Sequence, residues 1–199
     1  MSNRFLVAVI VVLLSLLIGL GLFWNPQSAP PPADLNPLPP GGDFVLQSAN
    51  GPVALRDYRG RLAVLYFGYS FCPDICPTNL TALSGGMALL TPTEREKLAV
   101  FFISVDPQRD TPEHLKTYVE FFDRQMIGVT GSPAEIAELA SRYGVFYAVQ
   151  PAANAGEDYV VDHSAESYIV GADGRLLARL AHDTPPDQVV ALIRQYLPN

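Results

Sequence analysis

Two short apolar runs constrain the fold of this chain more than any other feature. Leu62–Gly68 reads LAVLYFG and Leu98–Val105 reads LAVFFISV, and neither alternates apolar with polar side chains. Strands of this kind are buried on both faces, which is typical of parallel strands covered by helices. The two runs therefore predict neighbouring parallel strands inside an α/β domain.

Segments with helix signals follow these strands. One helix is predicted from about Pro77 to Leu90. Two more begin where an N-cap residue precedes proline, and they are expected over residues 111–122 and 132–143, the second ending at Gly144. Alternation of strands and helices predicts one sheet with helices packed against it.

Hairpin signals lie at both ends of this region. Asp43–Gln47 and Pro52–Leu55 flank an Asn-Gly turn, and Ser167–Val170 and Leu176–Ala181 flank a turn that contains Asp-Gly. An amphipathic helix is expected over residues 185–197. The whole pattern predicts an α/β, thioredoxin-like mixed sheet with helices on both faces and an added N-terminal β-hairpin.

The N-terminus carries an apolar segment. Residues 5–24 (FLVAVIVVLLSLLIGLGLFW) contain no charge, and a helix of this length covers about 30 Å, the thickness of the hydrocarbon core of a bilayer. A cleaved signal peptide is the alternative, but the run exceeds a usual signal core and Trp24 suits a membrane interface. We expect one retained N-terminal transmembrane helix.

Charge and composition suggest where the rest of the chain lies. Arg4 precedes the apolar run and the next basic residue is Arg56, so the bulk is expected outside the cytoplasm, on the periplasmic side of the inner membrane. The predicted organisation is a membrane anchor (1–24), a Pro-rich linker (25–42) and one domain (43–199). The net charge of −7 and scattered basic residues argue against nucleic acid as a partner.

The only two cysteines, Cys72 and Cys76, follow the first buried strand in the segment FCPDICP. The carboxyl ends of such strands are where open α/β sheets bind ligands. A structural disulfide here would close a very short loop and stabilise little. A redox dithiol remains possible, because a helix N-terminus lowers thiol pKa values. The C-x-x-x-C spacing differs from the redox C-x-x-C motif, however, and two soft thiolates suit copper.

Three histidines could complete a metal site. His114 is expected on an exposed helix face and His182 in a surface turn. His163 follows a Gly- and Ala-rich segment that could present it to the cysteines, although the pattern alone does not select it. A structural zinc site would need four ligands and is therefore disfavoured.

Three segments together resemble the Sco/SenC family of copper-binding proteins that serve cytochrome c oxidase assembly. They are Tyr66–Thr78 around the cysteines, Phe102–Pro112 (FISVDPQRDTP) and Val161–Ser164 (VDHS), and they occur in the order of the family. The resemblance covers residues 42–197 and implies a thioredoxin-like fold. It also implies copper, as Cu(I), Cu(II) or both, bound by Cys72, Cys76 and His163.

Several charged residues lie near these motifs. Asp74 could tune the thiolates, contact a partner or simply favour the helix N-terminus. We interpret Asp106, Arg109 and Asp110 as a structural ion-pair cluster rather than a direct part of the site. Asp162 is a doubtful ligand, because neighbouring side chains of an extended segment point in opposite directions.

Two functions are compatible with these features. The first is a copper metallochaperone that delivers copper to the binuclear copper centre of a cytochrome c oxidase subunit. The second is a thiol–disulfide oxidoreductase that reduces the cysteines of that centre through Cys72 and Cys76. A thioredoxin-like reductant or another copper chaperone would be a further partner. A peroxide-reducing thioredoxin-like enzyme is the least favoured interpretation.

Overall fold

The computed structural model describes residues 4, 10–16, 19, 38–151 and 159–198. Residues 38–199 form one compact unit, and residues 1–37 belong to another. Residues 10–16 are helical, but no helix among the described residues has the length and apolar character needed to cross a bilayer. Much of the predicted anchor and most of the predicted linker lie outside the described residues, so both stay predictions.

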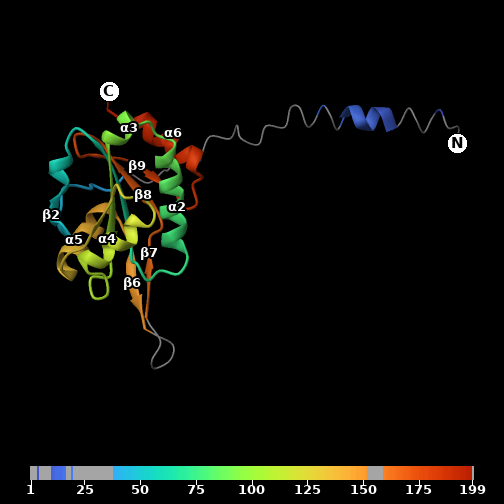
Figure 1. Cartoon of the computed structure of the whole chain (residues 1–199). Helices are drawn as coiled ribbons and strands as arrows, with labels where there is room; N and C mark the ends of the chain where they lie inside the picture. Colours follow the sequence, from blue (N-terminus) through green and yellow to red (C-terminus); the bar gives the residue numbers. More distant parts are fainter. Residues whose placement is uncertain (1–3, 5–9, 17–18, 20–37, 152–158, 199) are drawn as a thin grey trace. The chain divides into compact units, whose positions relative to one another are not determined.

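A five-stranded mixed sheet forms the centre of the larger unit (Figure 1). Its strands, in spatial order, are β5 (Met126–Val129), β4 (Leu98–Ser104), β3 (Leu62–Gly68), β8 (Ser167–Val170) and β9 (Leu176–Leu180). β3 and β4 are parallel, as are β4 and β5, whereas β8 is antiparallel to both β3 and β9. The predicted parallel pair is therefore confirmed, and both of its strands are buried along their whole length.

Helices cover both faces of this sheet, as predicted. They are α2 (Ile75–Ala88), α3 (Pro92–Glu96), α4 (Pro112–Glu120), α5 (Pro133–Tyr143) and α6 (Pro186–Tyr196). Alternate side chains of β3 and β4 enter two separate apolar clusters, because successive side chains of a strand point to opposite faces. One cluster packs against α5, and the other packs against α2, α4 and α6.

The predicted N-terminal hairpin is present. β1 (Val45–Ser48) and β2 (Gly51–Ala54) pair antiparallel, followed by the 3₁₀ helix η2 (Leu55–Tyr58). Gly51 adopts a φ of +106°, which the tight turn requires. Gln47 exchanges backbone hydrogen bonds with Thr130 at distances of 2.7 and 2.9 Å, so the hairpin is fixed to the end of β5.

Residues directly before the N-terminal hairpin already pack against the rest of the domain. The Gly41 amide donates to the Arg142 carbonyl (2.9 Å), and the Tyr143 hydroxyl donates to the Gly42 carbonyl (2.8 Å). The compact unit accordingly begins at residue 38, within the segment predicted as the end of the linker.

A second, two-stranded sheet carries His163. β6 (Tyr147–Gln150) and β7 (Val160–His163) pair antiparallel and form a ribbon that extends from the rest of the domain (Figure 1). The sequence analysis did not predict a strand at His163, and the structure shows that His163 is the last residue of β7. Most side chains of both strands are partly or fully exposed, so they lack the apolar alternation that announces a strand.

Candidate metal centre

The turn between β3 and α2 positions the two cysteines. The Cys72 amide donates to the Tyr69 carbonyl (3.2 Å), which closes the turn after the strand. Cys76 lies in the first turn of α2, where its side chain is fully buried, and its amide points to Cys72 Sγ at 3.5 Å. Cys72 is half-buried, so one sulfur is reachable from solvent and the other is enclosed.

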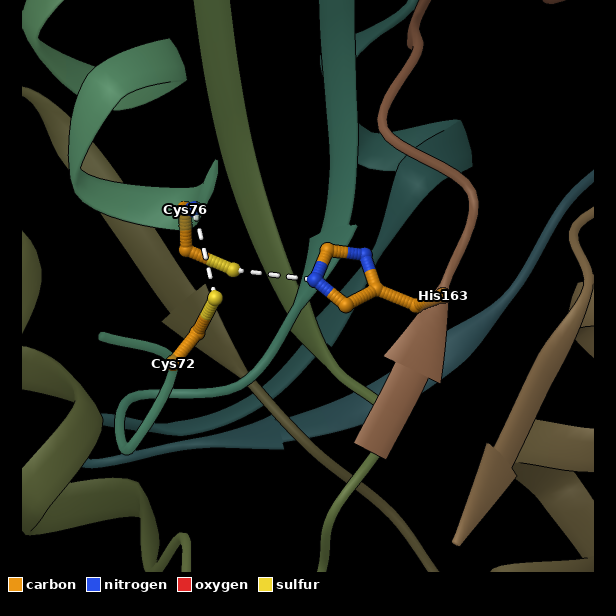
Figure 2. Close-up of side chains that lie close together, drawn as sticks. All are labelled: Cys72, Cys76 and His163. Carbon is orange, nitrogen blue, oxygen red and sulfur yellow. Dashed lines mark hydrogen bonds between the residues drawn. The ribbon is translucent and has the colours of Figure 1, made fainter. Parts of the chain in front are cut away.

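His163 reaches the cysteines from the end of β7. Its Nε2 lies 3.3 Å from Cys76 Sγ, and the donor atoms of Cys72, Cys76 and His163 all lie within 4.8 Å of one another (Figure 2). His163 Nδ1 lies 2.9 Å from the Ser164 carbonyl, which can only accept a hydrogen bond. Nδ1 therefore carries the proton, and in the neutral ring the lone pair on Nε2 faces the sulfurs.

Burial and mutual contact shift the pKa values of the two thiols in opposite directions. The hydrogen bond from the Cys76 thiol is the main cause that lowers the pKa of Cys72, to about 3, and burial opposes it. Burial, followed by the contact with Cys72, raises the pKa of Cys76 above its usual range. The pair therefore holds a thiolate at Cys72 beside a thiol at Cys76 at neutral pH.

Gly68 and two tyrosines surround this group. A Cβ at position 68 would lie 2.6 Å from Cys76 Sγ, so only glycine leaves room for the sulfur. The rings of Tyr66 and Tyr69 lie edge-on to the His163 ring, with centroids 6.2 and 5.8 Å away. The sequence interpretation assigned none of these three a role, although a glycine ending a buried strand just before the cysteines was an available signal.

The other candidate residues lie outside the group. His114 is exposed and lies 2.9 Å from Ser70 Oγ, and His182 bonds Asn79 Oδ1 through Nδ1 (2.9 Å). Asp162 accepts from Gln150 Nε2 (2.7 Å), which agrees with the expectation that it points away.

Asp74 is the N-cap residue of α2, although its side chain caps no backbone N–H of the helix. A backbone hydrogen bond at Asp74 is one of the smaller effects that lower the pKa of Cys72. Of the roles considered for Asp74, this hydrogen bond favours tuning of the Cys72 thiolate, through the backbone of Asp74 rather than through its carboxylate.

The charged cluster after β4 is structural, as the sequence suggested. Asp110 is fully buried and accepts hydrogen bonds from Ser104 Oγ (2.5 Å), from the Ser70 amide (3.0 Å) and from Ser70 Oγ. Arg109 forms an ion pair with Asp106 at 2.5 Å. The segment before Cys72 is thus tied to the loop after β4.

The fold and this group of side chains define the class of protein. It is a thioredoxin-like domain with two cysteines and one histidine arranged so that they could hold a metal ion. Residues 33–198 match the model of the SCO1/SenC family. The chain belongs to this family.

Individual relatives agree with this assignment. A SCO2-like protein of Rickettsia conorii is 34% identical over 197 residues, covering 93% of this chain and 95% of its own length. The human mitochondrial SCO1 homolog is 33% identical over 159 residues, covering 79% of this chain and 52% of its own length.

Solved structures extend the similarity to the fold. Bradyrhizobium japonicum ScoI with copper bound has a TM-score of 0.72 at 36% identity, covering 79% of this chain and 99% of its own. Yeast Sco1 with copper bound has a TM-score of 0.70 at 32% identity, covering 80% and 91%. BsSco has a TM-score of 0.59 at 25% identity, covering 80% of this chain and 94% of its own. It is described as having a disulfide switch and as belonging to the Sco family of cytochrome c oxidase assembly proteins.

Proposed function

We propose that this chain is a copper metallochaperone. It binds copper through Cys72 Sγ, Cys76 Sγ and His163 Nε2 and delivers the ion to the binuclear copper centre of cytochrome c oxidase. The observation that carries the proposal is the convergence of these three donor atoms within 4.8 Å from segments 87 residues apart in sequence. The copper held by similar structures supports the choice of metal.

The donor set fits copper in geometry and chemistry. Metal–sulfur and metal–nitrogen bonds of about 2.0–2.3 Å place two ligands of one ion roughly 3–4 Å apart. The 3.3 Å between Cys76 Sγ and His163 Nε2 lies within this range, and the 4.8 Å limit requires only a small closure. Two thiolates are soft ligands for Cu(I), and the imidazole extends the site to Cu(II).

The arrangement also suits release of the ion. Only three protein ligands hold it, and Cys72 is half-buried, so incoming ligands of an acceptor could reach the ion from that side. Each acceptor ligand that binds would displace one of this chain's donors, and a displaced Cys76 could recover its proton because burial favours the thiol. The copper-accepting oxidase subunit is the partner that this proposal requires.

A second function is favoured by the state of the two thiols. Both cysteines are free, and the low pKa of Cys72 provides a nucleophilic thiolate. Cys72 would attack a partner disulfide, releasing one partner thiolate. Cys76 would then lose its proton and displace the second, leaving a Cys72–Cys76 disulfide and a reduced partner. The disulfide switch named for BsSco supports this alternative.

The proposal includes a location. Residues 1–24 would anchor the chain in the inner membrane, and residues 25–42 would hold the domain on the periplasmic side. Support comes from the uncharged run at 5–24 with Arg4 before it. Protease added to spheroplasts should digest the domain without lysis, and protection from the protease would contradict this location.

Metal analysis of the full-length protein separates the two functions. The wild-type chain should bind one copper ion. His163→Ala should lose tight copper binding but keep the exchange of its thiols with a disulfide substrate. Cys72→Ser and Cys76→Ser should lose both properties. His182→Ala is the control, because this exposed histidine lies outside the metal group.

If His163→Ala binds copper as tightly as the wild type, the three-ligand centre is wrong. Retained thiol exchange without copper binding in the wild type would favour the oxidoreductase instead.

A further inference from the structure

The guanidinium group of Arg109 lies among aromatic rings from both ligand-bearing segments. Its Cζ is 3.6 Å from the ring centroid of Tyr159, 4.9 Å from that of Phe71 and 5.5 Å from that of Tyr69. Phe71 directly precedes Cys72, and Tyr159 directly precedes the strand that ends at His163. One side chain from the loop after β4 therefore contacts both halves of the metal group.

Hydrogen bonds fix the guanidinium in this place. Arg109 Nε donates to Asp106 Oδ2 (2.5 Å), and Arg109 Nη1 donates to the Tyr159 carbonyl (2.9 Å). The Tyr159 hydroxyl donates to Asp106 Oδ1 (2.7 Å). Asp106 is only 3% exposed, so these donors take the place of water around its carboxylate. The three residues form a closed network that ties the base of β7 to the loop after β4.

A path of direct contacts leads from Arg109 to the imidazole. The Tyr69 ring lies between them, 5.5 Å from Arg109 Cζ and 5.8 Å from the His163 ring. Nη2 of Arg109 is buried and has no hydrogen-bond partner within the described part of the chain, so the aromatic rings supply its surroundings. Loss of the guanidinium would remove the common support of Tyr69, Phe71 and Tyr159.

We propose that Arg109 is a positioning residue of the metal centre, which sets the separation between His163 and the two sulfurs. This inference rests on the proposed copper function and deepens it. Cys72 and Cys76 lie four residues apart in one continuous segment, so the chain itself limits how far their sulfurs can separate. The imidazole comes from a separate ribbon, and Arg109 joins that ribbon to the cysteine segment. Because Cu(II) depends on the nitrogen ligand more than Cu(I) does, loss of Arg109 should weaken Cu(II) binding more than Cu(I) binding.

Lysine cannot replace arginine here. An ammonium group could still pair with Asp106, but it lacks the planar fork that bonds the Tyr159 carbonyl while stacking on its ring. Arg109→Lys therefore keeps the charge and removes the link between the two segments.

Arg95 provides a matched control. It is also partly buried, and it bonds both carboxylate oxygens of Asp123 at 2.8 and 2.6 Å. Its other partners are Gln125, directly before β5, and the carbonyl of Met87 near the C-terminal end of α2, whereas Cys76 lies in the first turn of that helix. Arg95→Ala therefore removes a comparable ion pair without touching the site.

The test measures copper affinity of the full-length chain by competition with a chelator, for Cu(II) in air and for Cu(I) without oxygen. Arg109→Ala and Arg109→Lys should each weaken Cu(II) binding roughly 10–100-fold, as is typical when an outer partner of a metal ligand is lost. Their Cu(I) affinity should fall by less than about tenfold. The thiolate-to-Cu(II) absorption band and the paramagnetic resonance spectrum of both variants should change. Arg95→Ala should keep the wild-type affinity and spectra.

The two Arg109 variants decide the outcome even if one of them folds poorly. Should Arg109→Ala not fold, Arg109→Lys carries the test, with its thermal midpoint measured beside that of Arg95→Ala. Wild-type Cu(II) affinity and spectra in a folded Arg109→Lys protein would overturn the inference. So would equal losses for Cu(I) and Cu(II). Failure of the proposed function looks different, because the wild type itself would then bind no copper, or His163→Ala would bind it normally.

Discussion

Replacing Gly68 with alanine should damage the metal centre more than it damages the fold. The added Cβ would lie 2.6 Å from Cys76 Sγ and 3.1 Å from Phe102 Cε2. Non-bonded carbon contacts are normally about 3.5–4.0 Å, so the sulfur would have to retreat by about 1 Å. Sites that bind a metal tightly keep their ligand distances within about 0.2 Å. A movement of this size should therefore weaken copper binding by at least about tenfold.

The same substitution overpacks a buried strand, which costs about 1–3 kcal/mol. In a chain of this length each kcal/mol lowers the thermal midpoint by roughly 2–4 °C. Gly128→Ala is the matched control. Gly128 lies on β5, outside the metal group, and an added Cβ there would lie 2.8 Å from Leu115 Cβ. Both variants should lose stability, and only Gly68→Ala should lose copper affinity. Chelator competition and thermal unfolding measure the two effects, and unchanged copper affinity in Gly68→Ala would refute the reasoning.

Three further predictions concern reactivity and stability. Brief treatment with iodoacetamide at neutral pH should modify Cys72 before Cys76, because Cys72 is the half-buried thiolate and Cys76 the enclosed thiol; peptide mass spectrometry giving the reverse order would contradict this assignment. The hydrogen bond from Arg194 lowers the pKa of Glu94 from 4.5 to about 2, so this carboxylate stabilises the fold above pH 4.5 and the contribution is lost as the pH falls toward 2. Glu94→Gln should lower the thermal midpoint at pH 7, with the difference from wild type shrinking as the pH falls from 4.5; a difference independent of pH would contradict the ion pair. Asn79→Ala should lower the free energy of unfolding, measured by chemical denaturation, by about 1–3 kcal/mol. It removes the buried amide that bonds the carbonyl of residue 165 and the turn at residue 182. An unchanged unfolding midpoint would show that these bonds contribute little.

The sequence was most informative where burial or turn chemistry is local. β3 and β4 could be predicted because every residue in them is buried. The N-terminal hairpin could be predicted because Asn50-Gly51 supplies the turn. The helix starts at Thr111 and Ser132 could be predicted because an N-cap residue followed by proline is also a local signal. Both side chains accept the expected backbone hydrogen bond.

Elements that depend on distant partners were missed. β5 is a short strand that pairs with β4. Among the described residues β6 and β7 pair with each other alone, and residues 151–159 separate them in the sequence. The partly exposed side chains of β6 and β7 show no apolar period, so nothing local marks these two segments as strands. The short helix α3 did carry a local signal, the capping box of Thr91 and Glu94, which the sequence interpretation overlooked.

The candidate site shows the same division. The position of Cys72 and Cys76 after a buried strand pointed to chemistry at the end of the sheet, and the three residues do come together there. The choice of His163 over the other histidines came from family resemblance, since the ribbon that carries it is a long-range structure. The network of Arg109, Asp106 and Tyr159 could not be foreseen, because Tyr159 lies in a segment without a recognisable pattern.

X-ray absorption at the copper edge tests the central claim most directly. The copper-loaded wild-type protein should show two sulfur neighbours and one nitrogen neighbour, and the nitrogen should disappear from the spectrum of His163→Ala. A shell made only of oxygen and nitrogen, or a spectrum that His163→Ala leaves unchanged, would contradict a centre built from Cys72, Cys76 and His163.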